Sequence, residues 1–139
     1  MSTPPRRRGR LQPAHWILVI ALAAAMVVAA LLPVLTSAPG REITLVVRDM
    51  TFFLESDPLH PNPTIDVKTG ERVRVIVKNQ DRGMTHDFAV PAINAAMSAI
   101  SWNQENGITF AVPSTPSTYE YVCRPHILMM RGTIRVTGN

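Results

Sequence analysis

Apolar and polar residues alternate along the C-terminal two thirds of the chain. Ile43, Leu45 and Val47 would share one face of an extended segment, and the same spacing returns at 64–68 and 72–78. Because strand side chains point alternately to opposite sides, each segment predicts a strand with one buried face. Shorter runs bounded by Pro, Gly, Ser or Asn predict four further strands, at 88–90, 108–112, 118–123 and 133–137.

The segments between these strands complete the predicted fold. Lys68-Thr69-Gly70-Glu71 is predicted to form a hairpin turn. Residues 91–102 are rich in Ala, Met and Ile without alternation, so we expect a short helix or an irregular crossover there. The pattern as a whole predicts an all-β fold over residues 42–139, a Greek-key β-sandwich of about seven strands.

The N-terminal part has a different pattern. From Trp16 to Leu35 no side chain is charged, and the Trp16 indole is the one that can form hydrogen bonds. A helix of this length spans roughly 30 Å, enough to cross the hydrocarbon of a membrane. We therefore predict a single N-terminal transmembrane helix at residues 16–35.

The charges around this apolar run predict its orientation. Four arginines precede it and no comparable cluster follows, which places the basic tail 1–15 in the cytoplasm. The linker 36–41 and the β-domain then lie on the extracytoplasmic side, as in a single-pass protein of the cell membrane. The alternative is a signal peptide cleaved near Thr36, Ser37 and Ala38.

Charge also bears on the class of partner. The chain has 14 Lys and Arg against 10 Asp and Glu, but the four arginines of the tail account for the whole difference. A nucleic-acid-binding domain needs a basic face, so no nucleic-acid partner is predicted.

A single cysteine limits the chemistry of the domain. Cys123 excludes an intramolecular disulfide, a four-cysteine zinc site and a C-x-x-C redox pair. The loop after it also carries His126, Met129 and Met130, so one short segment offers a thiolate, an imidazole and a thioether. Copper suits this donor set, and the electron-transfer form of such a site needs a second histidine, for which His86 is the candidate.

These residues resemble the cupredoxins, the blue type 1 copper family of plastocyanin and amicyanin. The resemblance rests on the segment 62–73, on His86-Asp87-Phe88, on the run 117–123 that leads into Cys123, and on Cys-x-x-His followed by Met. It implies one copper per chain with His86, Cys123 and His126 as equatorial ligands and Met130 as the axial ligand. Met130 is chosen over Met129 because Met130-Arg131-Gly132 fits the family's entry into the last strand.

One departure from the family concerns the residue after the first histidine. Asp87 stands where cupredoxins commonly have an Asn whose side chain forms hydrogen bonds behind the site, so the surroundings of the metal are expected to differ.

The function expected from this resemblance is one-electron transfer by a membrane-tethered carrier rather than catalysis. Its redox partners, proteins of the membrane or periplasm, would dock at the apolar residues around His126. Two alternatives are a copper delivery or storage module and an enzyme resembling nitrosocyanin, in which a Glu such as Glu55 replaces the thioether. Multicopper oxidases and the binuclear centre of cytochrome oxidase subunit II are excluded, since the sequence lacks His-x-His pairs and a second cysteine.

Overall fold

The chain divides into two compact units, Met1–Ala38 and Pro39–Asn139, each described here by itself. The computed structural model describes residues 17, 19–23, 26 and 40–138. The described residues of the first unit are helical, and no helix among the described residues is both long and apolar enough to span a membrane. Most of the predicted span 16–35, the tail 1–15 and most of the linker 36–41 lie outside the described residues.

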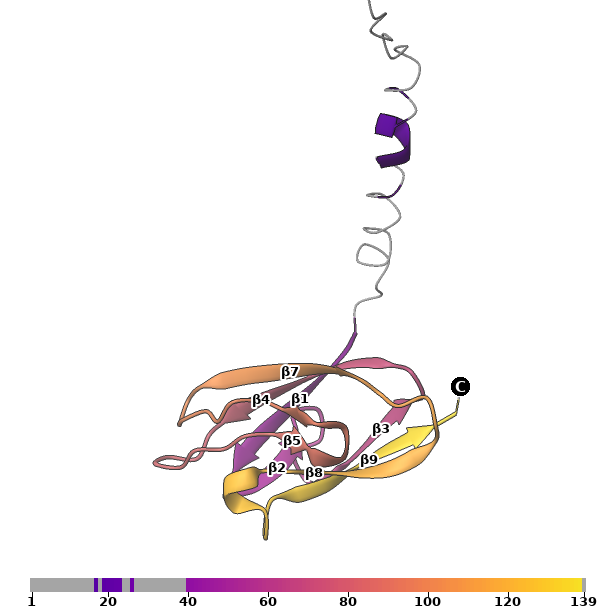
Figure 1. Ribbon diagram of the computed structural model, residues 1–139. Helices are drawn as coiled ribbons and strands as arrows, with labels where there is room; N and C mark the ends of the chain where they lie inside the picture. The colour runs from indigo at the N-terminus through magenta and orange to yellow at the C-terminus, as the bar shows by residue number, and fades with distance from the viewer. Residues whose placement is uncertain (1–16, 18, 24–25, 27–39, 139) are drawn as a thin grey trace, which may run out of the picture. The chain divides into compact units, whose positions relative to one another are not determined.

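The second unit is a sandwich of two β-sheets (Figure 1). One sheet has the strand order β2-β1-β4-β7, and the other has the order β3-β9-β8-β5-β6. This arrangement confirms the predicted all-β sandwich. The strands are β1 (Arg41–Arg48), β2 (Thr51–Leu54), β3 (Thr64–Lys68), β4 (Arg72–Asn79), β5 (Ala89–Val90), β6 (Ala95–Ala96), β7 (Glu105–Ala111), β8 (Ser117–Val122) and β9 (Arg131–Thr137).

The core lies on the strand faces that the alternating pattern predicted to be apolar. Leu45 of β1 lies beside Val77 of β4, and Ile65 of β3 lies beside Ile134 of β9; all four are buried. Shifting either pair of strands by one residue would turn its apolar side chains toward solvent. The alternation therefore determines the register as well as the buried face.

The turn at Lys68–Glu71 differs from the prediction. The chain does turn there, with Gly70 at φ +71° and the Glu71 amide donating to the Lys68 carbonyl. However, β3 pairs with β9, whereas β4 pairs with β1 and β7 in the other sheet. The predicted hairpin is wrong because the same local turn can join two strands of one sheet or carry the chain between sheets.

A hairpin that was not predicted joins β1 and β2. Arg48 lies opposite Thr51, so Asp49 and Met50 form a two-residue loop, and both have positive φ, at 50° and 53°. Two consecutive residues with positive φ are typical of the turns that close tight hairpins. The pair Asp-Met is not among the usual sequences for such a turn, and the Asp81 carboxylate supports it from outside by accepting both amide hydrogens.

The segment 91–102 contains a short helix, as one of the two expectations had it, and also a short strand that was not predicted. It begins with the 3₁₀-helix η1 (Pro91–Ile93) and continues into β6, which pairs with β5. The predicted strand at 88–90 is correspondingly short, since β5 begins at Ala89.

Three aromatic rings fill the core beside the end of β8. Phe88 stacks on Tyr121 with 5.1 Å between ring centroids, and Phe52 contacts both rings edge to face. The Tyr121 hydroxyl donates to the Pro63 carbonyl at 2.7 Å, which satisfies its polar end. A side chain at Gly132 would overlap the Tyr121 ring, so this glycine makes room for it. These contacts fix the strand that leads into Cys123.

Candidate metal centre

Two separate segments bring the predicted ligands together. Cys123 directly follows β8, and His126 ends the 3₁₀-helix η2 (Arg124–His126) between β8 and β9. His86 lies between β4 and β5, where its backbone pairs with that of Ile100 through two hydrogen bonds. The site therefore depends on contacts between residues that are distant in the sequence.

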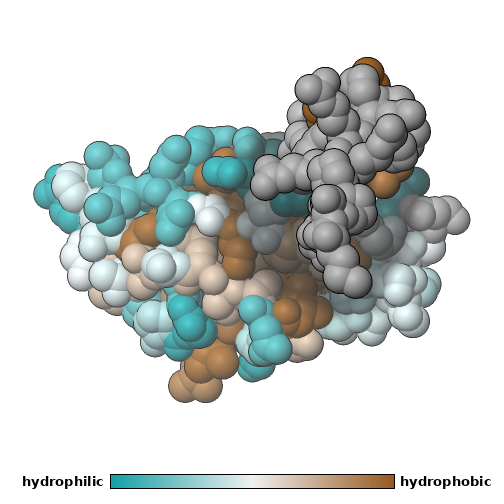
Figure 2. All heavy atoms as spheres, turned by 45° about the horizontal axis from the view of Figure 1, so that its top comes forward, coloured by the Kyte–Doolittle hydropathy of each residue, from teal (hydrophilic) through white to brown (hydrophobic). Residues whose placement is uncertain are grey.

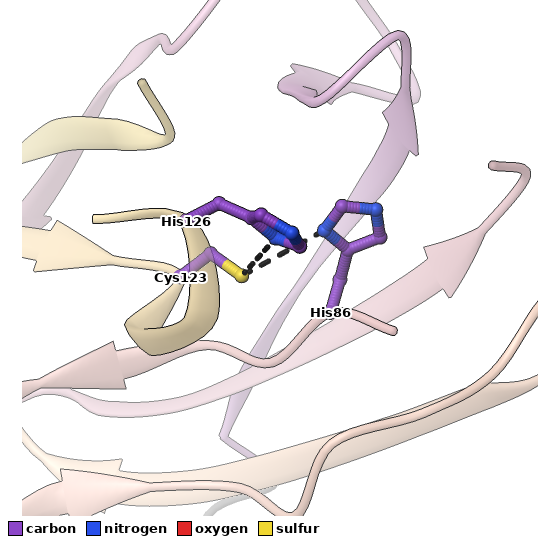
Figure 3. A group of neighbouring side chains, drawn as sticks. All are labelled: His86, Cys123 and His126. Atoms are coloured by element: carbon purple, nitrogen blue, oxygen red, sulfur yellow. Dashed lines mark hydrogen bonds between the residues drawn. The ribbon is translucent and has the colours of Figure 1, made fainter. Parts of the chain in front are cut away.

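The donor atoms of these residues converge on one point (Figure 3). Cys123 Sγ lies 3.7 Å from His86 Nδ1 and 3.6 Å from His126 Nδ1, and all three ligand atoms lie within 4.8 Å of one another. His86 and Cys123 are buried, and His126 is partly exposed. One sulfur and two imidazole nitrogens at this spacing are a donor set that fits copper.

The loop from Cys123 to Met130 is closed by its own backbone. The Cys123 amide donates to the Met130 carbonyl at 2.9 Å, and the amides of Met129 and Met130 both donate to the His126 carbonyl. Met130 is fully buried in this conformation, whereas Met129 is 54% exposed. Of the two methionines, Met130 is the one held inside the domain.

Asp87 connects the two ligand-bearing segments. Its backbone amide donates to Cys123 Sγ at 3.5 Å, and its side chain is only 2% exposed. One carboxylate oxygen accepts from the Arg124 amide at 2.7 Å and the other from Arg124 Nε at 2.6 Å. Arg124 also donates to the Met97 carbonyl. Where the family commonly has Asn, this chain therefore has the buried carboxylate of Asp87, whose charge is balanced by the Arg124 guanidinium.

A second carboxylate, which the sequence reasoning did not single out, lies on the other side of His86. Asp81 Oδ2 is 3.0 Å from His86 Nε2, in a geometry that falls short of a hydrogen bond. His86 Nε2 is the one fully buried side-chain nitrogen or oxygen, in the part of the chain that the structure describes, without a hydrogen-bond partner. A carboxylate five residues before a candidate ligand was the available signal in the sequence.

Burial determines the protonation of the metal-free site. It lowers the pKa of His86 below its usual value, and the Asp81 carboxylate opposes this effect only in part. It raises the pKa of the Cys123 thiol, while the hydrogen bond from the Asp87 amide acts in the opposite direction. At neutral pH the site therefore offers a neutral imidazole at His86, and a metal that binds Cys123 displaces a proton.

Two other residues with side chains that could bind a metal, Glu55 and His60, lie outside the cluster. Glu55, the candidate ligand of the nitrosocyanin-like alternative, accepts a hydrogen bond from Lys78 Nζ at 2.7 Å and is not part of the donor group. His60 is exposed and contacts Asp57. Neither residue is placed to complete the site.

Comparison with known proteins agrees with this geometry. The model of a family of copper binding proteins, the plastocyanin/azurin family, matches residues 56–137, more than half of the chain. No match was found among curated proteins.

Solved structures share the fold. Reduced auracyanin from the photosynthetic bacterium Roseiflexus castenholzii is 17% identical, with 72% of this chain and 99% of that chain covered and a TM-score of 0.58. Rusticyanin from Thiobacillus ferrooxidans is 22% identical, with 73% and 79% covered and a TM-score of 0.52. Copper nitrite reductase from Nitrosomonas europaea is 18% identical, with 73% and 42% covered and a TM-score of 0.57. The family match and the converging donor atoms lead to one conclusion: the chain belongs to the plastocyanin/azurin family of copper-binding proteins, the cupredoxins, and its cofactor is copper.

Proposed function

We propose that this protein is a one-electron carrier with a mononuclear type 1 copper site whose ligands are His86, Cys123, His126 and Met130. The observation that carries the proposal is the convergence of Cys123 Sγ and two Nδ1 atoms in a buried position. When bound, copper supplies a one-electron Cu(II)/Cu(I) couple.

The residues around the donors favour electron transfer over bond chemistry. His86 and Cys123 are closed off from solvent, which keeps water from the metal position on their side. The backbone hydrogen bonds of the loop and the Asp87–Arg124 pair hold the donors in place, so little reorganisation accompanies a change of charge. Glu55, the glutamate named for the nitrosocyanin-like alternative, is paired with Lys78 outside the donor group and does not support that alternative.

The partner surface in this proposal is the apolar tip, defined as Ile127, Leu128 and Met129. All three residues are exposed, Leu128 at 88%. They follow His126, whose ring is partly exposed and contacts Cys123 Sγ, so a protein that docks there comes close to the metal ligands. Figure 2 shows hydrophilic residues over the upper left of the visible face of the domain, and hydrophobic residues both in its middle and at its lower edge. Exposed apolar surface of this kind supports transient docking of redox proteins.

We further propose that the domain is tethered to the outer face of the cytoplasmic membrane. The support is the uncharged run 16–35 and the arginines before it. Protease added to intact cells should digest the copper domain and spare the basic tail, and recovery of a mature form that begins near Pro39 would instead favour a cleaved signal peptide.

The absorption spectrum of the copper-loaded full chain tests the carrier proposal. We expect an intense blue band from the bond between thiolate and Cu(II), with one copper per chain. Cys123→Ser should abolish the band, whereas the control Met129→Leu should retain it. A thiolate band that persists in Cys123→Ser would disprove the site. Ready loss of copper to a Cu(I) chelator would favour the alternative of copper delivery.

A further inference from the structure

The buried face of His86 that points away from Cys123 meets a carboxylate. Nδ1 of the ring is directed at Cys123 Sγ, and the other ring nitrogen lies on the far side (Figure 3). There Asp81 Oδ2 lies 3.0 Å from His86 Nε2. The imidazole is fully buried and the Asp81 side chain is 11% exposed, so this contact is largely shielded from water.

Asp81 is held in place by the turn between β1 and β2 and by Asn79, two residues before it. Its carboxylate accepts the amide hydrogens of Asp49 and Met50, the latter at 2.8 Å, and its own amide donates to Asn79 Oδ1 at 2.8 Å. Asn79 is itself buried and donates to the carbonyl of Ile100, the residue whose backbone pairs with that of His86. If the carboxylate moved away from the ring, it would lose its hydrogen bonds to the turn between β1 and β2.

The contact with Asp81 bears on which ring nitrogen of a neutral His86 carries the proton. When Nδ1 offers its lone pair to a metal, the single ring proton must reside on Nε2. A buried N–H without an acceptor is destabilising, because it has lost its hydrogen bond to water and gained none in return. Asp81 Oδ2, 3.0 Å from His86 Nε2, is the acceptor within reach of that proton.

We propose that Asp81 is a positioning residue that holds the proton of His86 on Nε2, aims Nδ1 at the metal position, and lowers the reduction potential of the site. This inference rests on the proposed function for its redox part. A carboxylate hydrogen-bonded to a metal-binding histidine raises the basicity of that ligand. Its negative charge in a partly buried position also favours the more positive oxidised site over the reduced one.

The principal test compares the full chain as wild type, as Asp81→Asn and as Asp49→Asn. The control Asp49→Asn removes an exposed carboxylate from the turn that Asp81 contacts. Asparagine tolerates the positive φ of residue 49. We expect Asp81→Asn to keep the blue band while the ratio of Cu(II) to Cu(I) affinity falls by about tenfold, an upward shift of ~59 mV for a one-electron couple. Asp49→Asn should shift the potential far less.

A second measurement needs no copper. Nitrogen-15 chemical shifts of the metal-free wild-type chain should show His86 as the Nε2–H tautomer. Asp81→Ala, which removes the acceptor, should populate both tautomers.

The outcomes separate this inference from the proposed function. Equal shifts of the potential in Asp81→Asn and Asp49→Asn, or an Nδ1–H tautomer in the wild type, would overturn the role of Asp81. A wild-type chain without the blue band would refute the proposed function, and the tautomer of His86 would still decide whether Asp81 positions the ring.

Discussion

The two segments that supply the metal donors are held in opposite ways. The His86 segment, residues 79–88, depends on contacts with distant parts of the chain: the turn at Asp49 and Met50, and the backbone of Ile100. The loop from Cys123 to Met130 is closed by backbone hydrogen bonds among its own residues, and its tip projects apolar side chains. One segment is positioned by the fold, whereas the other is largely positioned by itself.

This difference suggests a division of tasks within one site. The His86 segment carries the partly buried carboxylate of Asp81 and the buried carboxylate of Asp87, so substitutions there should change stability and reduction potential. The loop carries the exposed residues Leu128 and Met129, so substitutions there should change contact with partners. Asp87 and Arg124 join the two segments and should be the most sensitive point.

The largest expected effect follows from removing the contact between Asp87 and Arg124. Asp87→Ala removes the acceptor of two Arg124 hydrogen bonds, one of them from the partly buried Arg124 amide, which is left without a partner. The Arg124 side chain is half-exposed and can turn to water, so we expect the free energy of unfolding of the metal-free chain to fall by about 2 kcal/mol, measured by denaturant titration. The control Asp66→Ala breaks the exposed pair with Arg135 and should cost less than about 1 kcal/mol. Similar losses in the two variants would show that the Asp87–Arg124 contact does not join the segments.

The next effect is the pH dependence of copper affinity. Burial raises the pKa of the Cys123 thiol, so the thiol is protonated up to and beyond its usual pKa of about 8.5. Binding as thiolate then releases one proton, while His86, whose pKa burial lowers, is already neutral. Between about pH 7 and 8.5 the affinity should rise about tenfold per pH unit. Competition with a chelator at several pH values measures it, and a flat profile would contradict the raised pKa.

A smaller effect separates the two methionines of the loop. Met130→Leu keeps the buried volume, so the free energy of unfolding should change by less than about 1.5 kcal/mol. The reduction potential should rise, because an apolar side chain replaces an electron-pair donor beside the metal and so disfavours the more highly charged oxidised site. Met129→Leu, at a half-exposed position, is the matched control and should leave the potential unchanged. A potential that responds only to Met129→Leu would identify that residue as the axial ligand.

The smallest expected effect comes from the tip of the loop, where a substitution should change the rate of electron transfer to a partner and leave the metal site as it is. Leu128→Asp places a charge on the most exposed residue of the apolar tip. Electron transfer to a membrane redox partner should slow by a few-fold, since a charge at the docking rim mainly affects association. Stopped-flow kinetics would measure this rate, with the blue spectrum as the control. An unchanged rate in a folded, copper-loaded variant would remove the tip as the docking site.

Local patterns were sufficient for much of this protein. Alternation predicted β1, β3 and β4 and their buried faces because one side of a half-buried strand must be apolar. The spacing of Cys123, His126 and Met130 was also informative, because the loop that holds them is short and closes on its own backbone.

Other features depended on contacts that no local pattern contains. The turn at Lys68–Glu71 joins two sheets, and the hairpin at Asp49 and Met50 is supported by the carboxylate of Asp81. The sequence by itself determined most of the strands and the candidate donors, because those depend on neighbours along the chain, but it missed β2 and β6. Only the tertiary structure decided that Asp81 meets His86 and that Asp87 pairs with Arg124, because a buried charge is placed by the packing of distant segments around it.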